Sequence, residues 1–364
     1  MAILAFIIIL GLLIFVHELG HFWVAKKMGA RVDEFGFGFP PRLFSVKKGE
    51  TVYSINFIPL GGFVKIFGED GEDKKDKYSF AAKKAWQRTA ILLAGVTMNI
   101  VLAALLLSTG YIIGLPWAVD DNQVVSGAKV QITEIAAGSP AEKAGMKVGD
   151  TILGAELSSA GANAAGGQLN NASKVIDIQN FIDKKKGQEV LVLLKRGQSE
   201  FQVKIVPRVN PPRGEGAMGV ALARVANISF PWYRAIYEGA KETFVLIWLI
   251  ISSLAVLIWQ FFSTGHGAGQ VIGPVGLYAI TGQAAQMGFV YLLQLAALLS
   301  VNLAIVNALP FPALDGGRVL FLIIEKIKGS PVSESVEKAI HTAGFVLLTL
   351  LMIVITFKDI ARLF

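Results

Sequence analysis

The chain of 364 residues contains no cysteine. This absence excludes disulfide bonds, thiolate ligands for a metal ion and cysteine nucleophiles, although it says nothing about the compartment. Charged residues are also scarce, at 17%, whereas hydrophobic residues reach 53% and the mean hydropathy is +0.55. Such a composition is too apolar for an ordinary soluble domain and is typical of a protein that lies in a lipid bilayer.

Basic residues are absent before the first apolar segment and frequent after it. The loop that follows this segment contains Lys26, Lys27, Arg31, Arg42, Lys47, Lys48, Lys83, Lys84 and Arg88. Basic residues next to apolar segments act as topology signals, so we expect the N-terminus outside and this loop in the cytoplasm. For the same reason the net charge of +7 does not indicate nucleic-acid binding.

The first segment is long enough to cross a membrane. Residues 2–16 carry no charge, and with the turns up to residue 28 they can span a hydrocarbon core of roughly 30 Å. A cleavable signal peptide is the alternative, but a basic region before the apolar run is missing. In the expected direction, His17 follows about 24 Å of helix, which places it in the cytoplasmic half of the membrane.

The first segment ends in three polar groups, in the pentapeptide His17-Glu18-Leu19-Gly20-His21. On a helix, His17 and His21 lie on one face and can bind one metal ion, while Glu18 beside them can act on a water molecule. A chance match, or histidines that only form hydrogen bonds within a bundle, is the alternative. Because ionisable groups inside a membrane are costly, we favour the functional interpretation.

A catalytic zinc site usually has three protein ligands, so a third residue is needed. Asp315 is the best candidate, at the end of the apolar run that starts near Phe289. Pro310 and Pro312 free backbone carbonyls before it, and the two glycines after it permit a sharp turn. A simple exit loop is the alternative, which we disfavour because Asn307 and Asp315 stand together at membrane depth.

Four motifs together resemble the site-2 proteases, which are zinc metalloproteases that cleave within membranes, and among them the bacterial RseP type. These are Phe15-Val16-His17-Glu18-Leu19-Gly20-His21-Phe22, Phe35-Gly36-Phe37-Gly38-Phe39-Pro40, Pro59-Leu60-Gly61-Gly62-Phe63-Val64-Lys65 and Asn307-Ala308-Leu309-Pro310-Phe311-Pro312-Ala313-Leu314-Asp315-Gly316-Gly317. The resemblance implies zinc bound by His17, His21 and Asp315, and Glu18 as catalytic acid and base. It also implies a transmembrane protein substrate, with Asn307 holding the substrate backbone.

Residues 34–40 and 51–65 read as a membrane-associated β-element, because β-prone runs there alternate with glycine and proline. Such an element could pair with an extended substrate by strand addition, which exposes peptide bonds that a helix hides. We expect substrate contacts at Gly61, Gly62, Phe63, Pro310 and Pro312. A cytoplasmic hairpin with its own aromatic core is the alternative.

Hydropathy falls between residues 124 and 208, where the pattern resembles a single extracytoplasmic PDZ domain of the bacterial type. We expect strands at 130–135, 189–195 and 200–206, a turn into a further strand at 147–153, a capped short helix at 139–146, a second helix at 175–185 and a flexible loop at 158–173. RseP proteins of many Gram-negative bacteria have two such domains. A PDZ domain binds a peptide or chain terminus at a sheet edge, so selective capture, a size filter and a passive spacer all remain open.

The predicted fold class is a multi-pass α-helical membrane protein with a membrane-associated β-element and an inserted α+β PDZ domain. Its predicted parts are a membrane part at 1–117 whose second helix spans 89–117, the PDZ domain, a linker with a partly embedded segment at 209–288, and a membrane part at 289–364. Residues 243–262 are apolar enough to span. If they crossed alone, however, Asp315 would lie on the far side from His17. A return through 265–288, or a re-entrant or interfacial position, would remove this conflict.

These patterns predict a zinc-dependent endopeptidase of the bacterial cytoplasmic membrane, with the lipid bilayer and single-span membrane proteins as partners and no nucleic acid. The resemblance implies cleavage of anti-sigma factors or signal-peptide remnants. Two alternatives remain, a catalytically silent adaptor that uses its PDZ domain and a metal transporter. The intact motif at His17 disfavours the first, and the shortage of other intramembrane ligands disfavours the second.

Overall fold

The computed structural model describes residues 2–69, 75–157, 168–170, 172–212, 214–264, 272–330 and 332–361. The chain forms two compact units. The first unit comprises Met1–Thr109, Trp232–Gly282 and Leu293–Phe364, and the second comprises Gly110–Pro231 and Gln283–Leu292. Most of the predicted loop at 158–173 and part of the segment 265–288 lie outside the described residues.

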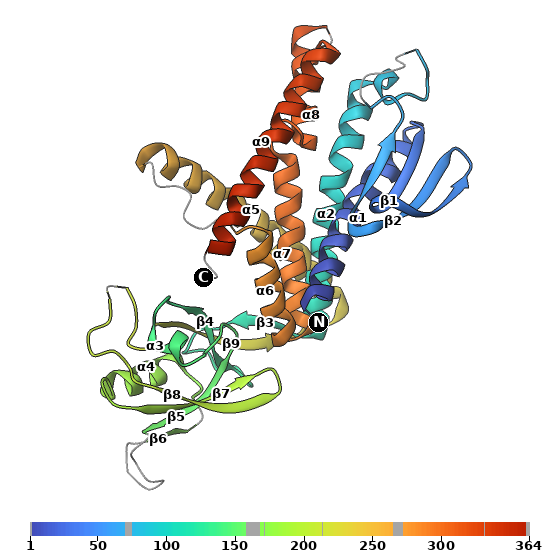
Figure 1. Ribbon diagram of the computed structural model, residues 1–364. Helices are drawn as coiled ribbons and strands as arrows, with labels where there is room; N and C mark the ends of the chain where they lie inside the picture. Colours follow the sequence, from blue (N-terminus) through green and yellow to red (C-terminus); the bar gives the residue numbers. More distant parts are fainter. Residues whose placement is uncertain are drawn as a thin grey trace. The chain divides into compact units, whose positions relative to one another are not determined.

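The first unit is a bundle of helices with a β-hairpin (Figure 1). Its helices are α1 (Ala2–Lys27), α2 (Ala85–Ile113), α5 (Trp232–Thr264), α6 (Pro274–Met287), α7 (Phe289–Ala308), α8 (Asp315–Lys328) and α9 (Glu334–Ala361), with the short 3-10 helix η1 (Phe80–Ala82) before α2. Five helices among the described residues are long and apolar enough to span a membrane: α1, α2, Trp232–Gln260 of α5, α7 and Ser335–Ala361 of α9. The first unit therefore has the architecture of a multi-pass membrane protein.

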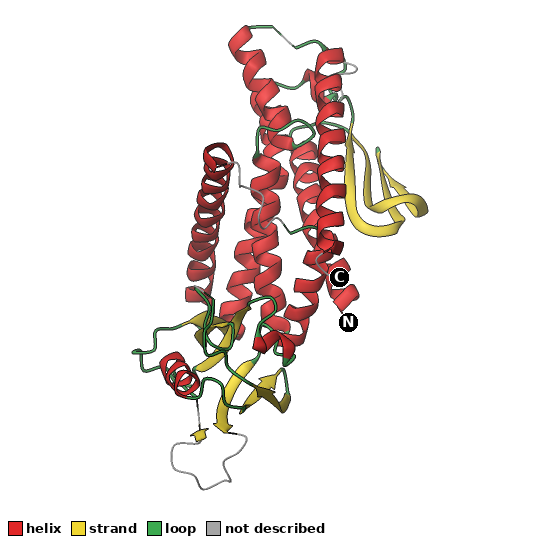
Figure 2. Ribbon diagram, turned by 60° about the vertical axis from the view of Figure 1, so that its left-hand side comes forward, coloured by secondary structure: helices red, strands yellow, loops and turns green. Residues whose placement is uncertain are grey.

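The hairpin consists of β1 (Val32–Lys48) and β2 (Thr51–Ile66), which curl beside the helices (Figure 2). Its aromatic rings pack on α1, because the Phe35 centroid lies 4.9 Å from Phe22 and 5.6 Å from Phe15. These contacts disfavour a hairpin with a core of its own, and the predicted β-element next to the first helix is present.

The curl gives the hairpin a free edge. Phe35 pairs with both Val64 and Tyr53, so the first part of β1 lies between two segments of β2. The segment from Gly62 to Ile66 pairs with β1 on one side, and no other described strand pairs with it on the other side. An extended chain could therefore add at this edge.

Helix α6 lies against the first helix at its N-terminal end. The rings of Tyr278 and Phe6 are 6.1 Å apart, and a Cβ atom on Gly282 would lie 3.3 Å from Ala2. Since α7 begins directly after α6, α7 starts near the beginning of α1 and runs in the same direction. The position of residues 243–288 relative to the membrane stays a prediction.

The second unit is an antiparallel sheet with two short helices. Its sheet has the order β3-β9-β4-β5-β7-β8, with β6 paired to β5. The elements are β3 (Leu115–Ala118), β4 (Lys129–Ile135), α3 (Pro140–Lys143), β5 (Thr151–Leu157), β6 (Gln168–Asn170), α4 (Val175–Lys184), β7 (Val190–Arg196), β8 (Ser199–Ile205) and β9 (Val220–Ile228). One face of the sheet and α4 enclose a core that includes Val130, Ile152, Ile178 and Leu194.

The buried ion pair between Asp150 and Arg196 fixes the turn that enters β5. Arg196 Nε and Nη2 donate to the two carboxylate oxygens at 2.7 Å each. This hydrogen bonding raises the pKa of the Arg196 guanidinium. The turn at Lys147–Asp150 and the cap of α3 by Ser139 are both features that the sequence predicted.

Two predicted boundaries are wrong. Helix α2 ends at Ile113, because Gly114 takes a φ of 117° and Pro116 follows, so Trp117 lies in β3 and not in the helix. The predicted linker that begins at 209 contains β9, which lies between β3 and β4. Arg224 of β9 donates to the carbonyls of Asp120, Gln123 and Ser173, which attaches the strand to the rest of the unit.

Helix α5 is continuous from Trp232 through the apolar segment 243–262. Its buried residues are Ala235, Gly239 and Thr243, which share one face. A Cβ atom on Gly239 would overlap Ser108 of α2, so the two helices approach closely there. Its remaining turns expose large apolar side chains such as Trp248 and Trp259.

Candidate metal centre

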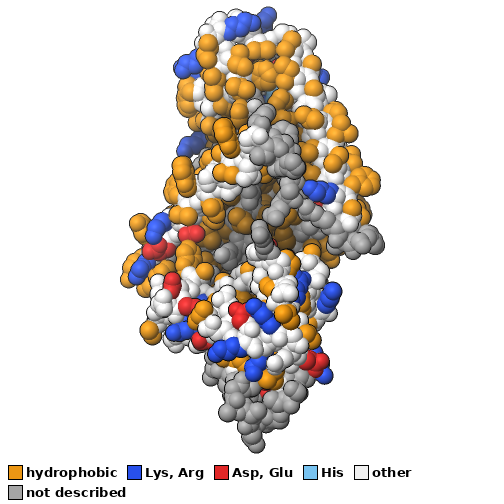
Figure 3. All heavy atoms as spheres, turned by 90° about the vertical axis from the view of Figure 1, so that its left-hand side faces the viewer, with side chains coloured by type: hydrophobic (Ala, Val, Ile, Leu, Met, Phe, Trp, Pro, Cys, Tyr) orange, Lys and Arg blue, Asp and Glu red, His pale blue; other side chains and the backbone are white. Residues whose placement is uncertain are grey.

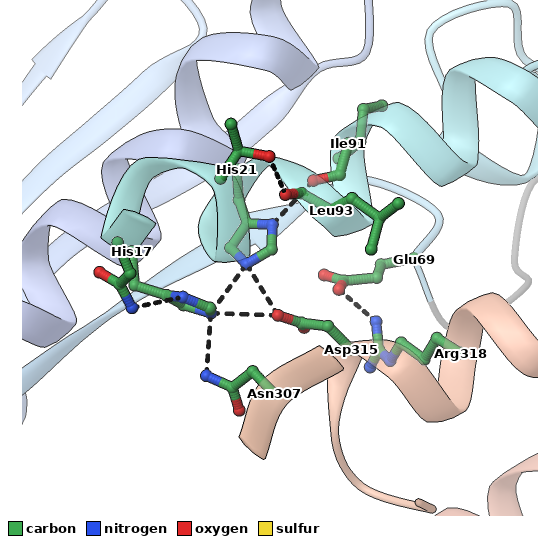
Figure 4. A network of polar contacts seen from close by, with 10 residues as sticks. His17, His21, Glu69, Ile91, Leu93, Asn307, Asp315 and Arg318 are labelled. Atoms are coloured by element: carbon green, nitrogen blue, oxygen red, sulfur yellow. Dashed lines mark hydrogen bonds and ion pairs between the residues drawn. The ribbon is translucent and has the colours of Figure 1, made fainter. Parts of the chain in front are cut away.

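His17, His21 and Asp315 converge in the first unit (Figure 4). The Nε2 atoms of the two histidines lie 3.1 Å apart. Asp315 Oδ2 lies 3.1 Å from His17 Nε2 and 3.3 Å from His21 Nε2. Both histidines are at least 94% buried, with exposed fractions of 5% and 6%, so the three atoms form a small triangle with little access to solvent.

The triangle fits a tetrahedral zinc ion. With bonds of about 2.0–2.2 Å, tetrahedral angles place the ligand atoms about 3.3–3.5 Å apart, close to the separations found here. Asp315 Oδ2 is buried and has no hydrogen-bond donor among the described residues. A buried carboxylate oxygen without a donor is costly, and a metal ion would satisfy it. Three protein ligands also leave a fourth position open for water or substrate.

The other ring nitrogen of His21 is fixed by the backbone of α2. Its Nδ1 donates to the Ile91 carbonyl at 2.8 Å, which leaves the Nε2 lone pair free for a metal (Figure 4). The sequence alone did not identify this carbonyl, because the contact depends on how α1 packs against α2.

Asn99 of α2 plays the corresponding part for His17. Its Nδ2 and His17 Nδ1 are 3.2 Å apart, and its Oδ1 is buried without a partner among the described residues. A metal on His17 Nε2 requires the proton on Nδ1, so the amide oxygen must face the ring. If the amide oxygen and nitrogen exchange places, the oxygen accepts from His17 Nδ1 and is no longer without a partner. Ser300 of α7 anchors Asn99 by donating to its backbone carbonyl at 2.8 Å.

Small residues let α1 and α2 meet at the site. A Cβ atom on Gly20 would lie 2.8 Å from the backbone carbon of Ala94, and one on Gly95 would lie 2.6 Å from His17 Cε1. Both distances are shorter than real Cβ contacts. Gly95 therefore leaves the room that the two imidazoles occupy, and no motif in the sequence pointed to it.

Asp315 is placed by the turn between α7 and α8. Cβ atoms on Gly316 and Gly317 would overlap the carbonyls of Ala308 and Phe311, so only glycine lets the chain fold back so tightly. Asp315 is the first residue of α8, where backbone N–H groups favour a negative charge.

Helix α9 supports this turn from outside. The backbone N–H of Ala313 donates to His341 Nδ1 at 2.9 Å, and Ala313 has a φ of 76°, which is unusual for a residue other than glycine. A Cβ atom on Gly344 would lie 2.5 Å from Pro312 Cβ. His341 thus holds the turn that carries Asp315.

A second link ties α8 to the hairpin. Arg318 Nη1 donates to Glu69 Oε1, just after the end of β2 (Figure 4). The hairpin, α8 and the metal ligands are thus connected through one side of the site.

Glu18 lies beside the hairpin. Its Cγ is 3.7 Å from the position that a Cβ atom on Gly62 would take. Gly62 therefore keeps the space next to Glu18 open, at the free edge of β2.

The predicted substrate contacts differ in their surroundings. Asn307 Nδ2 lies 3.5 Å from His17 Nε2, so this side chain is at the metal centre itself. Phe63 packs over Gly36 within the hairpin. Pro310 is exposed, whereas Pro312 packs against α9 at Gly344.

The chain is similar to known proteins over its length. The model of peptidase family M50 matches residues 5–351. The regulator of sigma-W protease RasP of Bacillus subtilis is 31% identical over 100% of this chain and 99% of its own length. The zinc metalloprotease RasP of Geobacillus kaustophilus is 31% identical over 100% of this chain and 98% of its own. A protein of Clostridium acetobutylicum is 34% identical, with coverage of 99% and 96%.

Proposed function

Because the chain belongs to peptidase family M50, the site-2 proteases, we propose that it hydrolyses peptide bonds in or near the transmembrane segments of single-span membrane proteins. It is a multi-pass bacterial membrane protein and a metalloendopeptidase whose cofactor is zinc. In this proposal His17, His21 and Asp315 hold the ion and Glu18 is the catalytic acid and base.

The convergence of three ligand atoms from opposite ends of the chain carries this proposal. Each histidine has a partner for its Nδ1 atom, and Asp315 Oδ2 has no donor among the described side chains and backbone groups. Histidines that served only to pack the helices would not need a buried carboxylate oxygen that lies 3.1 and 3.3 Å from their Nε2 atoms and accepts no hydrogen bond from any described residue. The surroundings thus favour a metal centre over a structural hydrogen-bond cluster.

The chemistry divides between the ion and the side chains. When bound, zinc supplies Lewis-acid chemistry, which acidifies a water molecule and polarises the scissile carbonyl. Glu18 takes the proton of the attacking water and later passes it to the leaving amine. Asn307, beside His17, is placed to donate a hydrogen bond to the substrate backbone, and the buried surroundings exclude other water molecules.

The free edge of β2 supports a route for the substrate. A transmembrane helix hides its peptide bonds in internal hydrogen bonds, so it must unwind before attack. Pairing with Gly62–Ile66 would hold the unwound segment as a strand, and Gly61, Gly62 and Phe63 lie at the start of this edge. The strand would then pass next to Glu18. Pro310 and Pro312 contribute indirectly, by shaping the turn before Asp315.

We place the metal centre in the cytoplasmic half of the bacterial cytoplasmic membrane and the second unit outside, from the basic loop after α1. The second unit has the strands and helices expected of a PDZ domain, and its proposed ligand is a peptide or chain terminus. The B. subtilis relative is named as a regulator of a sigma factor, which favours anti-sigma factors over signal-peptide remnants as substrates here.

The test is cleavage of a single-span model substrate in liposomes by the wild type and by Glu18→Gln, with bound zinc measured in both. We expect equal zinc content and loss of at least about 100-fold in the rate for the variant, because a general base contributes about 10²–10⁴. A fully active Glu18→Gln variant would disprove the proposed role. Zinc without cleavage by either protein would favour the catalytically silent adaptor.

A further inference from the structure

The sheet of the second unit has two faces of opposite character. Val130, Ile152 and Leu194 lie on the buried face, with exposed fractions of 1% or less. Gln131 pairs with Thr151, and Thr151 pairs with Lys195, so these three side chains share the other face. Lys129 lies two residues before Gln131 and joins them there.

This polar face is partly covered and forms a cavity of about 380 Å³. The cover comes from Gln283–Leu292, the segment of the second unit that ends α6 and begins α7. Its Met287 packs on Gly149, and the Tyr291 hydroxyl and the Gln131 amide lie 3.2 Å apart. The volume lies within the range of small-ligand pockets.

The lining of the cavity is cationic and rich in hydrogen-bond donors. Lys129 and Lys195 contribute ammonium groups, and Thr151, Asn227 and Tyr291 contribute hydroxyl or amide groups. No carboxylate belongs to the described lining. Lys195 pairs with Glu200 at 3.3 Å outside the lining, while Lys129 has no ion pair with any residue that the structure describes. Such a site favours an anion with several acceptor oxygens.

The segment that covers the cavity leads into a candidate membrane span. Tyr291 is in the first turn of α7, a helix that is long and apolar enough to span a membrane. In the same unit, Tyr111 at the end of the α2 span stacks with Trp117 and Phe230, at centroid distances of 6.4 and 5.5 Å. Aromatic side chains gather at the membrane interface, where phosphate groups lie.

We propose that this cavity binds the phosphate group of an anionic phospholipid headgroup, held by Lys129 and Lys195. The glycerol moiety would lie against Thr151 and Tyr291, and the acyl chains would leave along the start of α7. This site is separate from the metal centre and goes beyond the proteolytic function.

The test compares lipid binding by the purified full-length protein in detergent. Phosphatidylglycerol and zwitterionic phosphatidylcholine are titrated separately, and the retained lipid is counted by native mass spectrometry. The variants are Lys129→Gln with Lys195→Gln, the charge-retaining Lys129→Arg with Lys195→Arg, and a matched control, Lys174→Gln with Lys204→Gln, from the same unit but outside the cavity lining.

We expect the wild type, the arginine variant and the control to prefer phosphatidylglycerol at one site. The glutamine variant should lose roughly 30-fold in affinity, since each of the two lysines near a membrane surface contributes about fivefold. Unchanged zinc content and unchanged protease resistance of the second unit would show that this variant is folded. An unchanged preference for phosphatidylglycerol in the glutamine variant would overturn the proposal.

Competition with inorganic phosphate and with glycerol 3-phosphate distinguishes a lipid headgroup from a free phosphate compound as the ligand. For a lipid site, millimolar concentrations of either should displace phosphatidylglycerol only weakly, because the acyl chains contribute to binding. Binding of free phosphate as tight as that of the lipid would contradict a headgroup site.

Discussion

Around the metal centre of the first unit the buried positions belong to polar and small residues, such as His17, Asn99, Ser300 and Gly95, whereas in the second unit they belong to valine, isoleucine and leucine. The surfaces are reversed as well. Figure 3 shows hydrophobic side chains over much of the visible face of the first unit, and charged side chains scattered over that of the second.

This difference follows from the solvent. In water, burial of apolar surface stabilises a unit by about 25 cal/mol per Å², so the second unit folds around an apolar core. Between lipid tails that gain is missing, and helices associate through close packing of small residues and through hydrogen bonds. Burial of polar and small residues around His17 therefore marks residues that position the metal centre, and burial of apolar residues in the second unit marks residues that stabilise a fold.

The strongest test of this contrast is Gly95→Ala. Its new methyl group would lie 2.6 Å from His17 Cε1, so the imidazoles must move. We expect zinc content at background and no detectable cleavage, measured by metal analysis and by the liposome assay. Gly11→Ala in α1 is the matched control, because its Cβ atom would lie at an ordinary 3.5 Å from the Pro59 carbonyl. Retained zinc in Gly95→Ala would contradict the inference that small buried residues of the first unit position the metal centre.

The counterpart in the second unit is Leu194→Ala, which removes a fully buried side chain. We expect the unit to lose about 2–5 kcal/mol of unfolding free energy, because a cavity remains in the core. Urea-dependent proteolysis of the full-length protein measures this change, with the half-exposed Val206→Ala as control. Zinc content should stay at the wild-type level, and its loss would mean that the two kinds of burial are coupled.

Substitutions of Asn99 test the comparison of the two units further. Leucine at this position is compatible with lipid surroundings but not with the metal centre. Asn99→Leu removes the acceptor for His17 Nδ1–H, and loss of such a partner weakens metal binding by about 10–100-fold. Asn99→Asp keeps an acceptor and should retain most of the affinity. Competition with a chelator measures both variants. Equal zinc affinity of the leucine variant and the wild type would refute the inferred amide orientation.

The smallest expected effect is at His341. His341→Leu removes one hydrogen bond to the backbone of the Asp315 turn, and a loss of about 1 kcal/mol corresponds to roughly fivefold weaker zinc binding. His341→Asn retains an acceptor near the Nδ1 position and should restore the affinity, which a purely packing role would not explain. A similar loss of affinity in both variants would argue against positioning through Ala313.

Local patterns predicted much of this architecture. The charge-free run before His17 and the four-residue spacing to His21 predict a helix with both imidazoles on one face, and α1 confirms this. The expected strands and helices of 130–206 correspond to β4, α3, β5, α4, β7 and β8. Each of these sequence patterns extends over only a few helical turns or one strand, so it predicts local structure.

Other features depend on contacts that are distant in the chain. The residues of β9 resemble a linker because they follow a segment rich in proline and glycine, and only pairing with β3 and β4 makes them part of the sheet. The role of Gly95 similarly depends on how closely α1 approaches α2. The local sequence predicts neither the strand pairing of β9 nor the helix that packs at Gly95.

The sequence by itself determined that this chain is a membrane protein with a helix carrying two histidines on one face, because helical period and apolar run length are local properties. It also singled out Asp315, through the polar residues, prolines and glycines around it. Only the tertiary structure decided that Asp315 Oδ2 lies 3.1 Å from His17 Nε2, that Asn99 and Ile91 orient the two imidazoles, and that a free strand edge lies beside Glu18. These distances arise from helix packing and strand pairing between segments far apart in the chain, and no single segment encodes them.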